Sequence, residues 1–410
     1  MDTAARTDLP LHPGEVRVDL AAVRHNVGAL RRAAGSAEVM AVVKADAYGH
    51  GLVPCASAAL AGGATWLGVA QAVEALQLRA AGVRAPVLCW LWTPGADLAP
   101  LVSADVDVSV SAPWALASAV AAAEATGRTA RVHLKVDTGL ARGGSTLADW
   151  DDLLAAAAPA SGAVEVVGIW SHMARADEPE HPTVRRQVEV FGDALAAARR
   201  RGVEPALRHL ANSAATLTAP GTHFDLVRPG IAVYGVSPVP QVAGAHALGL
   251  RPAMSLRARL ALVKDVPAGQ GGSYAHAYTT PTATTLGLVP LGYADGVPRH
   301  ASGAGPVRVH GHGATVDTTV AGRVCMDQVV VDLGPGASAR VAAGDPVELF
   351  GDGADGGPTA QGWAEAAGTI AYEVVTRVSP RLPRTYLGGS DDVPSGTVTH
   401  VEKVTDGDAS

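Results

Sequence analysis

The feature of this sequence that most restricts its fold is an alternation of short apolar runs with alanine-rich runs over the first 240 residues. The apolar runs are rich in β-branched residues and predict eight strands: VMAVVK (39–44), TWLGVA (65–70), PVLCWLW (86–92), VDVSV (106–110), RVHLKV (131–136), VEVVGIWSH (164–172), LRHLAN (207–212) and FDLV (224–227). Such alternation is typical of parallel strands joined by crossover helices. Eight repeats favour an α/β fold of the closed (β/α)8 TIM type over an open sheet.

The alanine-rich runs between the predicted strands have the features of helices that end at glycine. Three of them are LVPCASAALAGG (52–63), QAVEALQLRAAG (71–82) and RQVEVFGDALAAARRRG (186–202). A glycine at that point supplies the left-handed residue that closes the last helical turn. In barrels of this kind the chemistry lies where a strand ends and the next loop begins, so functional side chains are expected there.

The pattern changes after about residue 250. Segments such as SLRARLALVKDV (255–266) and GPVRVHG (305–311) alternate polar and apolar residues, with glycine and proline between them. This alternation predicts a mostly-β C-terminal domain, whose sheet the early run EVRVDL (15–20) could also join. The predicted parts are a barrel over 14–248, a β domain over 249–387 and a flexible tail over 388–410.

Composition argues against several classes of partner. The 410 residues carry a net charge of -7 and no basic run, which argues against nucleic acid or an anionic membrane surface. An uncharged stretch at 108–123 is rich in Ala and Ser, contains a proline and is too short for a membrane span. The acidic N-terminus lacks the apolar core of a signal peptide, so a cytoplasmic location is expected. Cysteine is found at three widely spaced positions, which fits reduced thiols rather than a disulfide framework or a metal site: Cys55, Cys89 and Cys325.

Lys44 stands at the end of the first predicted barrel strand, in AVVKADAYGHG (41–51). A lysine at a strand end is often a salt-bridged side chain or one whose amine reaches solvent. A second interpretation is a Schiff-base lysine, because partial burial lowers the pKa of the amine and leaves more of it free to attack an aldehyde. Lys44 alone does not decide between the two.

Other polar residues follow the predicted strands in the same way. They are Lys135, Arg142, His172, Asn212, Ser213 and Arg228. Each could be a surface loop residue, but the carboxyl ends of barrel strands converge in space, which favours one shared site. Tyrosines also gather in turns bounded by glycine or charged residues, as in DAYGHG and PLGYADGVPR, where phenol oxygens suit phosphate binding and proton transfer.

Seven motifs resemble those of the alanine racemase family, pyridoxal-phosphate enzymes built from a barrel and a β domain. In chain order they are AVVKADAYGHG (41–51), KVDTGLARGG (135–144), HLANSAA (209–215), RPGIAVYG (228–235), GYADGVPR (292–299), GRVCMDQ (322–328) and TIAYEVVTRVSPRLPRTY (369–386). The resemblance covers about residues 14 to 387. It implies a racemase that interconverts L-alanine and D-alanine and supplies D-alanine for peptidoglycan, in a homodimer whose active sites are shared between chains.

The resemblance also implies roles for individual residues. Lys44 and Tyr274 would be the two catalytic bases, and Lys44 would also hold pyridoxal 5′-phosphate. Arg142, Met326 and Tyr293 would contact the substrate. Lys135 corresponds to a family lysine that is often carbamylated, so it would be an N6-carboxylysine. The other cofactor contacts would come from Tyr48, Arg142, His172, Asn212, Ser213, Arg228, Gly230, Ile231 and Tyr372. No metal is implied.

Two positions depart from the family pattern, and several alternatives stay open. The family usually has glycine where this chain has Ala275 and commonly has glycine in place of Ala141, so a shift in loop geometry is expected. The alternatives are a racemase of the same fold acting on serine, lysine or a broader set of amino acids, a decarboxylase of the related fold, and a pyridoxal-phosphate-binding protein without turnover. The β domain that follows residue 250, and Tyr274 within it, count against the last.

Overall fold

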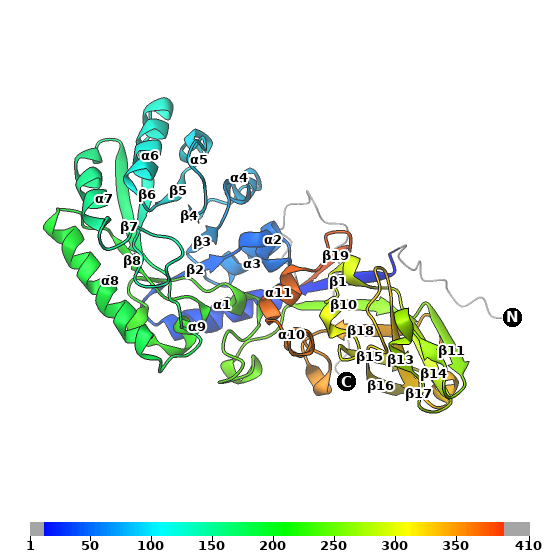
Figure 1. Ribbon diagram of the computed structural model, residues 1–410. Coiled ribbons are helices and arrows are strands. Elements are labelled where there is room, and N and C mark those ends of the chain that lie inside the picture. The colour runs from blue at the N-terminus through cyan, green and yellow to red at the C-terminus, as the bar shows by residue number, and fades with distance from the viewer. Residues whose placement is uncertain (1–11, 389–410) are drawn as a thin grey trace, which may run out of the picture. The chain divides into compact units, whose positions relative to one another are not determined.

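The computed structural model describes residues 12–388, which divide into two compact units (Figure 1). The first unit contains residues 21–251, and the second contains residues 12–20 together with 252–388. The predicted tail lies, from residue 389 onward, outside the described residues.

The unit of residues 21–251 is built on eight parallel strands, as the alternation predicted. Their order in the sheet is β8-β7-β6-β5-β4-β3-β2-β9. The two end strands are joined by backbone hydrogen bonds from Asp225 N to Arg208 O (3.0 Å) and from Arg228 N to Ala211 O (2.9 Å), so the sheet closes nearly completely. The strands are β2 (Glu38–Val42), β3 (Trp66–Val69), β4 (Val87–Cys89), β5 (Val106–Val110), β6 (Ala130–Lys135), β7 (Val164–Trp170), β8 (Leu207–His209) and β9 (Leu226–Val227).

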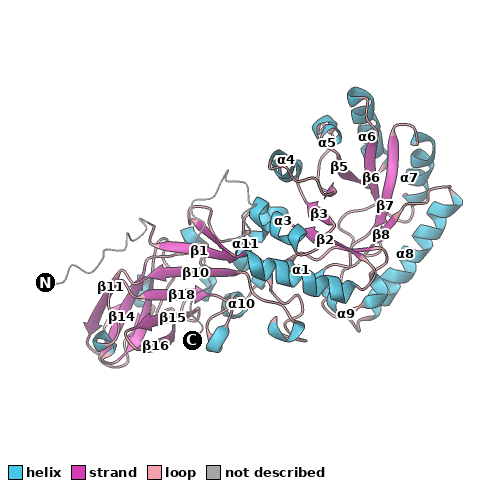
Figure 2. Cartoon of the chain, turned by 180° about the vertical axis from the view of Figure 1, so that it is seen from behind, coloured by secondary structure: helices cyan, strands magenta, loops and turns pink. Residues whose placement is uncertain are grey.

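Helices follow the barrel strands along the chain, and Figure 2 shows α4 to α8 arranged around the strands. The helices are α1 (Leu20–Ala34), α2 (Lys44–Tyr48), α3 (Leu52–Ala61), α4 (Ala72–Ala80), α5 (Ala99–Ser103), α6 (Pro113–Thr126), α7 (Trp150–Ala157), α8 (Pro182–Arg200) and α9 (Ser213–Thr218). Side chains from five different strands meet in one buried cluster, which fills the middle of the barrel: Met40, Trp66, Leu88, Val167 and Leu226. The barrel is therefore a packed core, and its chemistry is confined to its ends.

The other unit is mostly β, which confirms the prediction from the alternating segments after residue 250. Its largest sheet has the order β16-β15-β18-β10-β1-β19, and two smaller sheets have the orders β11-β14-β17 and β12-β13. Strand β1 lies between β10 and β19, pairing Val16 with Leu256 and with Arg384. The elements are β1 (Gly14–Asp19), β10 (Met254–Arg259), β11 (Leu262–Val266), β12 (Gly271–Gly272), β13 (Tyr278–Thr279), β14 (Thr284–Val289), β15 (Pro306–Gly311), β16 (Ala314–Thr319), β17 (Val329–Gly334), β18 (Pro346–Phe350), α10 (Ala360–Ala367), α11 (Ala371–Thr376) and β19 (Arg384–Leu387).

The three cysteines are free thiols, two of them buried. Burial raises the pKa of Cys55 and also that of Cys89, to about 12, so neither thiol ionises near neutral pH. No helix within residues 12–388 is long and apolar enough to cross a membrane. Over the same residues, His, Cys, Asp and Glu form no group that could hold a metal ion.

Candidate active site

Lys44 opens a left-handed turn immediately after the first barrel strand. The prediction that the strand runs to Lys44 was wrong by two residues, because β2 ends at Val42. Four residues in succession, Ala45 to Tyr48, have φ between 52° and 55°. This conformation costs roughly 1–2 kcal/mol for each residue other than glycine. Strain of this kind persists only where the surrounding structure holds it, and it is typical of functional sites.

Two carboxylates hold the strained turn in place. Glu74, from the start of α4, accepts a hydrogen bond from Ala45 N at 2.6 Å. Asp46 accepts one from Leu52 N at 2.7 Å, which ties the turn to the first residue of α3. Both are charged acceptors for backbone donors, which are among the stronger hydrogen bonds in proteins. The turn therefore presents Lys44 from a fixed backbone.

The Lys44 amine is less basic than a lysine in water. Burial lowers its pKa, the positive charge of Arg142 lowers it further, and Glu74 acts in the opposite direction. Both lowering effects disfavour the ammonium form, so a larger fraction of the amine is neutral at a given pH. The second interpretation of the sequence, a reactive lysine, requires this property.

Four more charged or ionisable side chains lie within electrostatic range of Lys44 or of one another. Lys135, at the end of β6, has a pKa lowered to about 8, first by burial and then by Arg228 and Arg142. His172, two residues after β7, has its pKa lowered well below the usual value by burial and then by Arg228 and Arg142. We call Lys44, Lys135, Arg142, His172 and Arg228 the cationic cluster. The structure thus brings together five of the residues that follow predicted strands.

The loop that carries Arg142 is organised by one aspartate. Asp137 Oδ1 accepts hydrogen bonds from the backbone N atoms of three loop residues: Gly139 (2.9 Å), Leu140 (3.0 Å) and Ala141 (3.2 Å). The loop then returns to the strand end, since Ser145 N donates to Lys135 O at 2.8 Å. Arg142 itself is exposed. Its guanidinium is therefore free to approach a ligand, while the backbone beneath it is fixed.

Arg228 is buried and is held by groups from two strand ends. Its guanidinium donates to Ser171 O (2.7 Å) and Leu210 O (3.2 Å) and approaches Nδ1 of His209 (3.2 Å) and of His172 (3.4 Å). It also lies over the ring of Trp170, with Cζ 4.8 Å from the ring centroid. Among the described residues, no carboxylate accepts a hydrogen bond from this guanidinium. Burial accordingly lowers the pKa of Arg228 to about 9.

Ser213, Gly230 and Tyr48 meet beside the cationic cluster. Ser213 Oγ accepts a hydrogen bond from Gly230 N at 2.8 Å. A Cβ atom at Gly230 would lie 2.3 Å from the Tyr48 hydroxyl oxygen, so only glycine allows the turn to approach that phenol. Asn212 caps α9 by accepting from Ala215 N at 3.1 Å, and Ile231 is fully buried in the next turn. Hydroxyls and a close backbone turn of this kind form a cradle for an oxyanion.

Four predicted site residues belong to the other unit. Tyr274 is 69% exposed, Met326 54% and Tyr293 41%, whereas Tyr372, in α11, is half-buried. Within this unit the loops carrying Tyr293 and Met326 are in contact, because Tyr293 N donates to Cys325 O (3.0 Å) and Ala294 N donates to Met326 O (2.9 Å). That these residues meet the cationic cluster stays a prediction.

Arg381 joins these two loops, and sequence reasoning missed it. Its guanidinium contacts Asp295 Oδ1 at 2.6 Å and Asp327 Oδ1 at 2.8 Å, one carboxylate from each loop. Asp295 is buried and also accepts from Gly292 N at 2.8 Å. These charged hydrogen bonds raise the pKa of Arg381. Arg381 lies in a quoted motif, but no local pattern indicates that its partners are 86 and 54 positions away.

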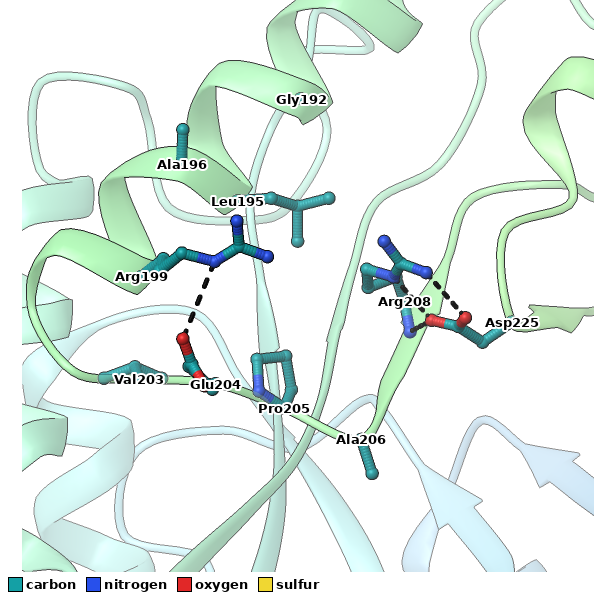
Figure 3. A pocket seen from close by; sticks show the side chains of 10 residues that line it. All are labelled: Gly192, Leu195, Ala196, Arg199, Val203, Glu204, Pro205, Ala206, Arg208 and Asp225. Atoms are coloured by element: carbon teal, nitrogen blue, oxygen red, sulfur yellow. Dashed lines mark hydrogen bonds and ion pairs between the residues drawn. The ribbon is translucent and has the colours of Figure 1, made fainter.

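A cavity of about 510 Å³ lies elsewhere in the barrel unit (Figure 3). It is lined by the end of α8 and by residues just before β8 and β9, so it is at the amino ends of the strands. Its charges pair internally: Arg208 with Asp225 at 2.6 Å and Arg199 with Glu204 at 3.6 Å. No charge in it awaits a ligand, in contrast to the cationic cluster at the carboxyl ends.

Comparison with known proteins identifies the family. The model of the alanine racemase N-terminal domain matches residues 18–238, and that of the C-terminal domain matches residues 253–386. The chain belongs to the alanine racemase family. An alanine racemase of Beutenbergia cavernae is 59% identical over 382 residues, covering 93% of this chain and 99% of that protein. One of Streptomyces coelicolor is 56% identical, covering 94% and 99%.

Solved structures of the alanine racemase family have the same fold. The crystal structure from a D-cycloserine-producing Streptomyces lavendulae matches with a TM-score of 0.90 at 56% identity, covering 93% of this chain and 99% of that one. A Bacillus anthracis alanine racemase with bound L-Ala-P matches with a TM-score of 0.82 at 35% identity, covering 96% and 98%.

The two departures from the family pattern lie where the backbone is left-handed. Ala141 has φ 55° and Ala275 has φ 60°, so each alanine adopts the conformation that a glycine would adopt more easily.

We therefore expect Ala141→Gly and Ala275→Gly each to raise the free energy of unfolding by about 0.5–1 kcal/mol, since the relief of left-handed strain exceeds the entropy that glycine adds to the unfolded chain. Chemical denaturation measures this. Ala121→Gly, at an exposed position inside α6, is the control and should lower stability by about the same amount. A decrease in all three variants would contradict the assignment of strain.

A second prediction concerns the contact that Arg381 makes. Arg381→Lys keeps the positive charge, but the lysine lacks the planar guanidinium that lets Arg381 bond to two carboxylates at once. Hydrogen exchange at Tyr293 N and Ala294 N should become roughly tenfold faster or more, as losing a hydrogen bond between charged groups implies. The control is Arg377→Lys, because Arg377 pairs with Glu373, one helical turn away on the surface. Equal exchange in the two variants would show that Arg381 does not hold the loops.

Proposed function

We propose that this protein is an alanine racemase, an isomerase that interconverts L-alanine and D-alanine with pyridoxal 5′-phosphate as its cofactor. The observation that carries the proposal is Lys44, a lysine of lowered pKa on a strained turn, surrounded by cations at the carboxyl ends of a barrel. The five members of the cluster are all basic residues, which suits a cofactor that carries a phosphate and a phenolic oxygen. The near-complete coverage of alanine racemases at 56–59% identity supports the choice of substrate.

The cofactor fits the residues present. Lys44 would form the covalent link to pyridoxal 5′-phosphate. Arg228, which can only donate hydrogen bonds, would face the ring nitrogen of the cofactor. Arg142 would approach its phenolic oxygen. The phosphate would be surrounded by the cradle of Tyr48, Ser213, Gly230 and Ile231, with Asn212 and Tyr372 beside them and His172 next to Arg228. Pyridoxal 5′-phosphate, when bound, delocalises the electron pair left by removal of the α-proton.

The protein must supply a base on each side of the α-carbon, because racemisation removes the proton from one face and returns one to the other. We assign these bases to Lys44 Nζ and Tyr274 Oη. The lowered pKa of Lys44 makes its neutral amine available near neutral pH. Arg142 and the Met326 backbone N–H would hold the substrate carboxylate, and Tyr293 would lie at the entrance.

Lys135 supports the orientation of Arg142. A pKa of about 8 leaves part of its amine neutral, which is the form that reacts with carbon dioxide. An N6-carboxylysine at this position would replace a positive charge with a negative one beside Arg142. That exchange would relieve the repulsion within the cationic cluster and give the exposed guanidinium a fixed partner.

We further propose a homodimer in which Tyr274, Tyr293 and Met326 complete the site of the partner subunit. All three are large side chains that one chain by itself leaves strongly exposed. The cytoplasmic location and the supply of D-alanine for peptidoglycan stay predictions. So does the alternative of a broader substrate range that includes serine or lysine.

The assignment of Tyr274 is tested by isotope exchange. Tyr274→Phe removes the phenol but leaves Lys44, so the variant should still exchange the α-proton of D-alanine with solvent deuterium while failing to exchange that of L-alanine. Racemisation should fall by ~10²–10⁴, as expected for loss of a positioned general base. Tyr278→Phe is the matched control, because that nearby phenol is bound to Asp332. Equal residual exchange from both enantiomers would remove Tyr274 from the face-specific role.

The shared site is tested by mixing two inactive variants. Lys44→Ala and Tyr274→Phe chains, combined under conditions that exchange subunits, should regain part of the racemase activity, since one of the two sites in a mixed dimer keeps both bases. Each variant mixed with itself is the control. Verified mixed dimers without activity would count against a site built from two chains.

A further inference from the structure

A series of hydrogen bonds leads from Arg228 through three buried side chains in the barrel interior. Arg228 Nη1 lies 3.2 Å from His209 Nδ1, His209 Nε2 lies 2.9 Å from His133 Nδ1, and His133 Nε2 lies 3.1 Å from Asp107 Oδ2. The two imidazoles are fully buried, and Asp107 is 1% exposed. The family motifs contain His209 and Arg228, but neither His133 nor Asp107.

The contacts permit one arrangement of protons along this chain. A guanidinium can only donate, so His209 Nδ1 must accept and the proton of His209 must be on Nε2. That proton can only be donated to His133 Nδ1, which places the proton of His133 on its own Nε2, where Asp107 accepts it. Burial and the charge of Arg228 lower the pKa of His209 well below its usual value, which is consistent with a neutral ring. Every hydrogen bond therefore points from Arg228 toward Asp107.

The neighbouring strands are built to allow these contacts. His133 lies on β6 and His209 on β8, on either side of β7, and Gly168 of β7 lies between them. A Cβ atom at Gly168 would come within 2.4 Å of His133 Nδ1 and 3.1 Å of His209 Nε2. Trp170 stacks on the His209 ring at 5.6 Å with an interplanar angle of 5°. Only glycine at position 168 lets the His133 and His209 rings meet.

Asp107 is itself held at the far end of the chain. Arg131 Nε and Nη2 contact its two oxygens at 2.9 Å and 3.3 Å, and Arg131 Nη1 also contacts Glu165 at 3.1 Å. Arg131 balances much of the Asp107 charge, so electrostatic attraction between Asp107 and Arg228 is weak. The series of hydrogen bonds therefore affects the orientation of Arg228 more than its electrostatic energy. Its effect is to present His209 with a lone pair, and not a proton, toward the guanidinium.

We propose that Asp107 is a positioning residue that, through His133 and His209, fixes the imidazole tautomers that Arg228 requires and so orients the guanidinium. The orientation matters for the reaction only if Arg228 faces the cofactor, so this part rests on the proposed function. The tautomers themselves do not depend on it. Asp107→Asn retains the shape, but its amide can donate to His133 Nε2 and reverse every hydrogen bond up to Arg228. Two donors would then face each other at His209 Nδ1.

The test uses the cofactor-loaded protein with ¹⁵N-labelled histidine. The spectrum of the unsubstituted protein near neutral pH should show His133 and His209 as neutral rings protonated on Nε2. In Asp107→Asn, both rings should move to the Nδ1-protonated form, and kcat for alanine racemisation should fall ~10-fold or more with KM within about twofold. Asp105→Asn is the matched control, because Asp105 is two residues away, exposed and paired with Arg128, and it should change neither measurement.

The outcomes separate this proposal from the proposed function. If either imidazole of the unsubstituted protein is protonated on Nδ1 or doubly protonated, the proposed series of hydrogen bonds from Arg228 to Asp107 is wrong. This measurement needs no variant to fold. Asp107→Asn with both tautomers unchanged overturns the role of Asp107. Reversed tautomers with unchanged kcat would show that Arg228 does not depend on the chain. If the exchange test on Tyr274 fails while the tautomers are as expected, the assigned reaction fails and the positioning of Arg228 stands.

Discussion

The burial of the Arg228 guanidinium is the constraint on which the rest of the barrel site depends. A cation removed from water needs acceptors for its N–H groups, and here these are two backbone carbonyls and two imidazoles. The positive charge then acts on its neighbours. Burial lowers the pKa of Lys135 and of His172 most, and the charge of Arg228 lowers both further, so a larger fraction of each side chain is neutral than in water. A carboxylate beside Arg228 would reduce this effect.

Backbone strain is concentrated near the residues assigned to the active site. The left-handed turn that follows Lys44, and the left-handed alanines at 141 and 275, all lie next to residues assigned to chemistry or ligand binding. In the turn the strain is supported by Glu74 and Asp46, which accept hydrogen bonds from its backbone. The general consequence is that the side chains assigned to chemistry are presented from segments that cannot relax without breaking other contacts.

The two units solve the problem of positioning in different ways. In the barrel, strand ends converge and bring side chains together through the fold itself. In the β unit, the loops around Tyr293 and Met326 lie outside regular strands, and they are joined by two backbone hydrogen bonds and by one arginine bonded to two carboxylates. Loops joined by so few contacts depend on each of them, whereas strand ends are supported by the whole sheet.

The sequence by itself determined the barrel, the mostly-β unit, the family and the set of residues at the strand ends, because hydrophobic periodicity and short motifs are local signals. It placed Lys44 in a strand, since four successive left-handed residues other than glycine have no recognisable pattern. Only the tertiary structure decided that Arg381 contacts two distant carboxylates and that His133 and Asp107 continue from Arg228. These contacts join residues 26 to 86 positions apart. The barrel contacts exist because the closed sheet places β5 beside β6 and lets side chains of β6 and β8 meet across one glycine of β7, which no single stretch of sequence encodes.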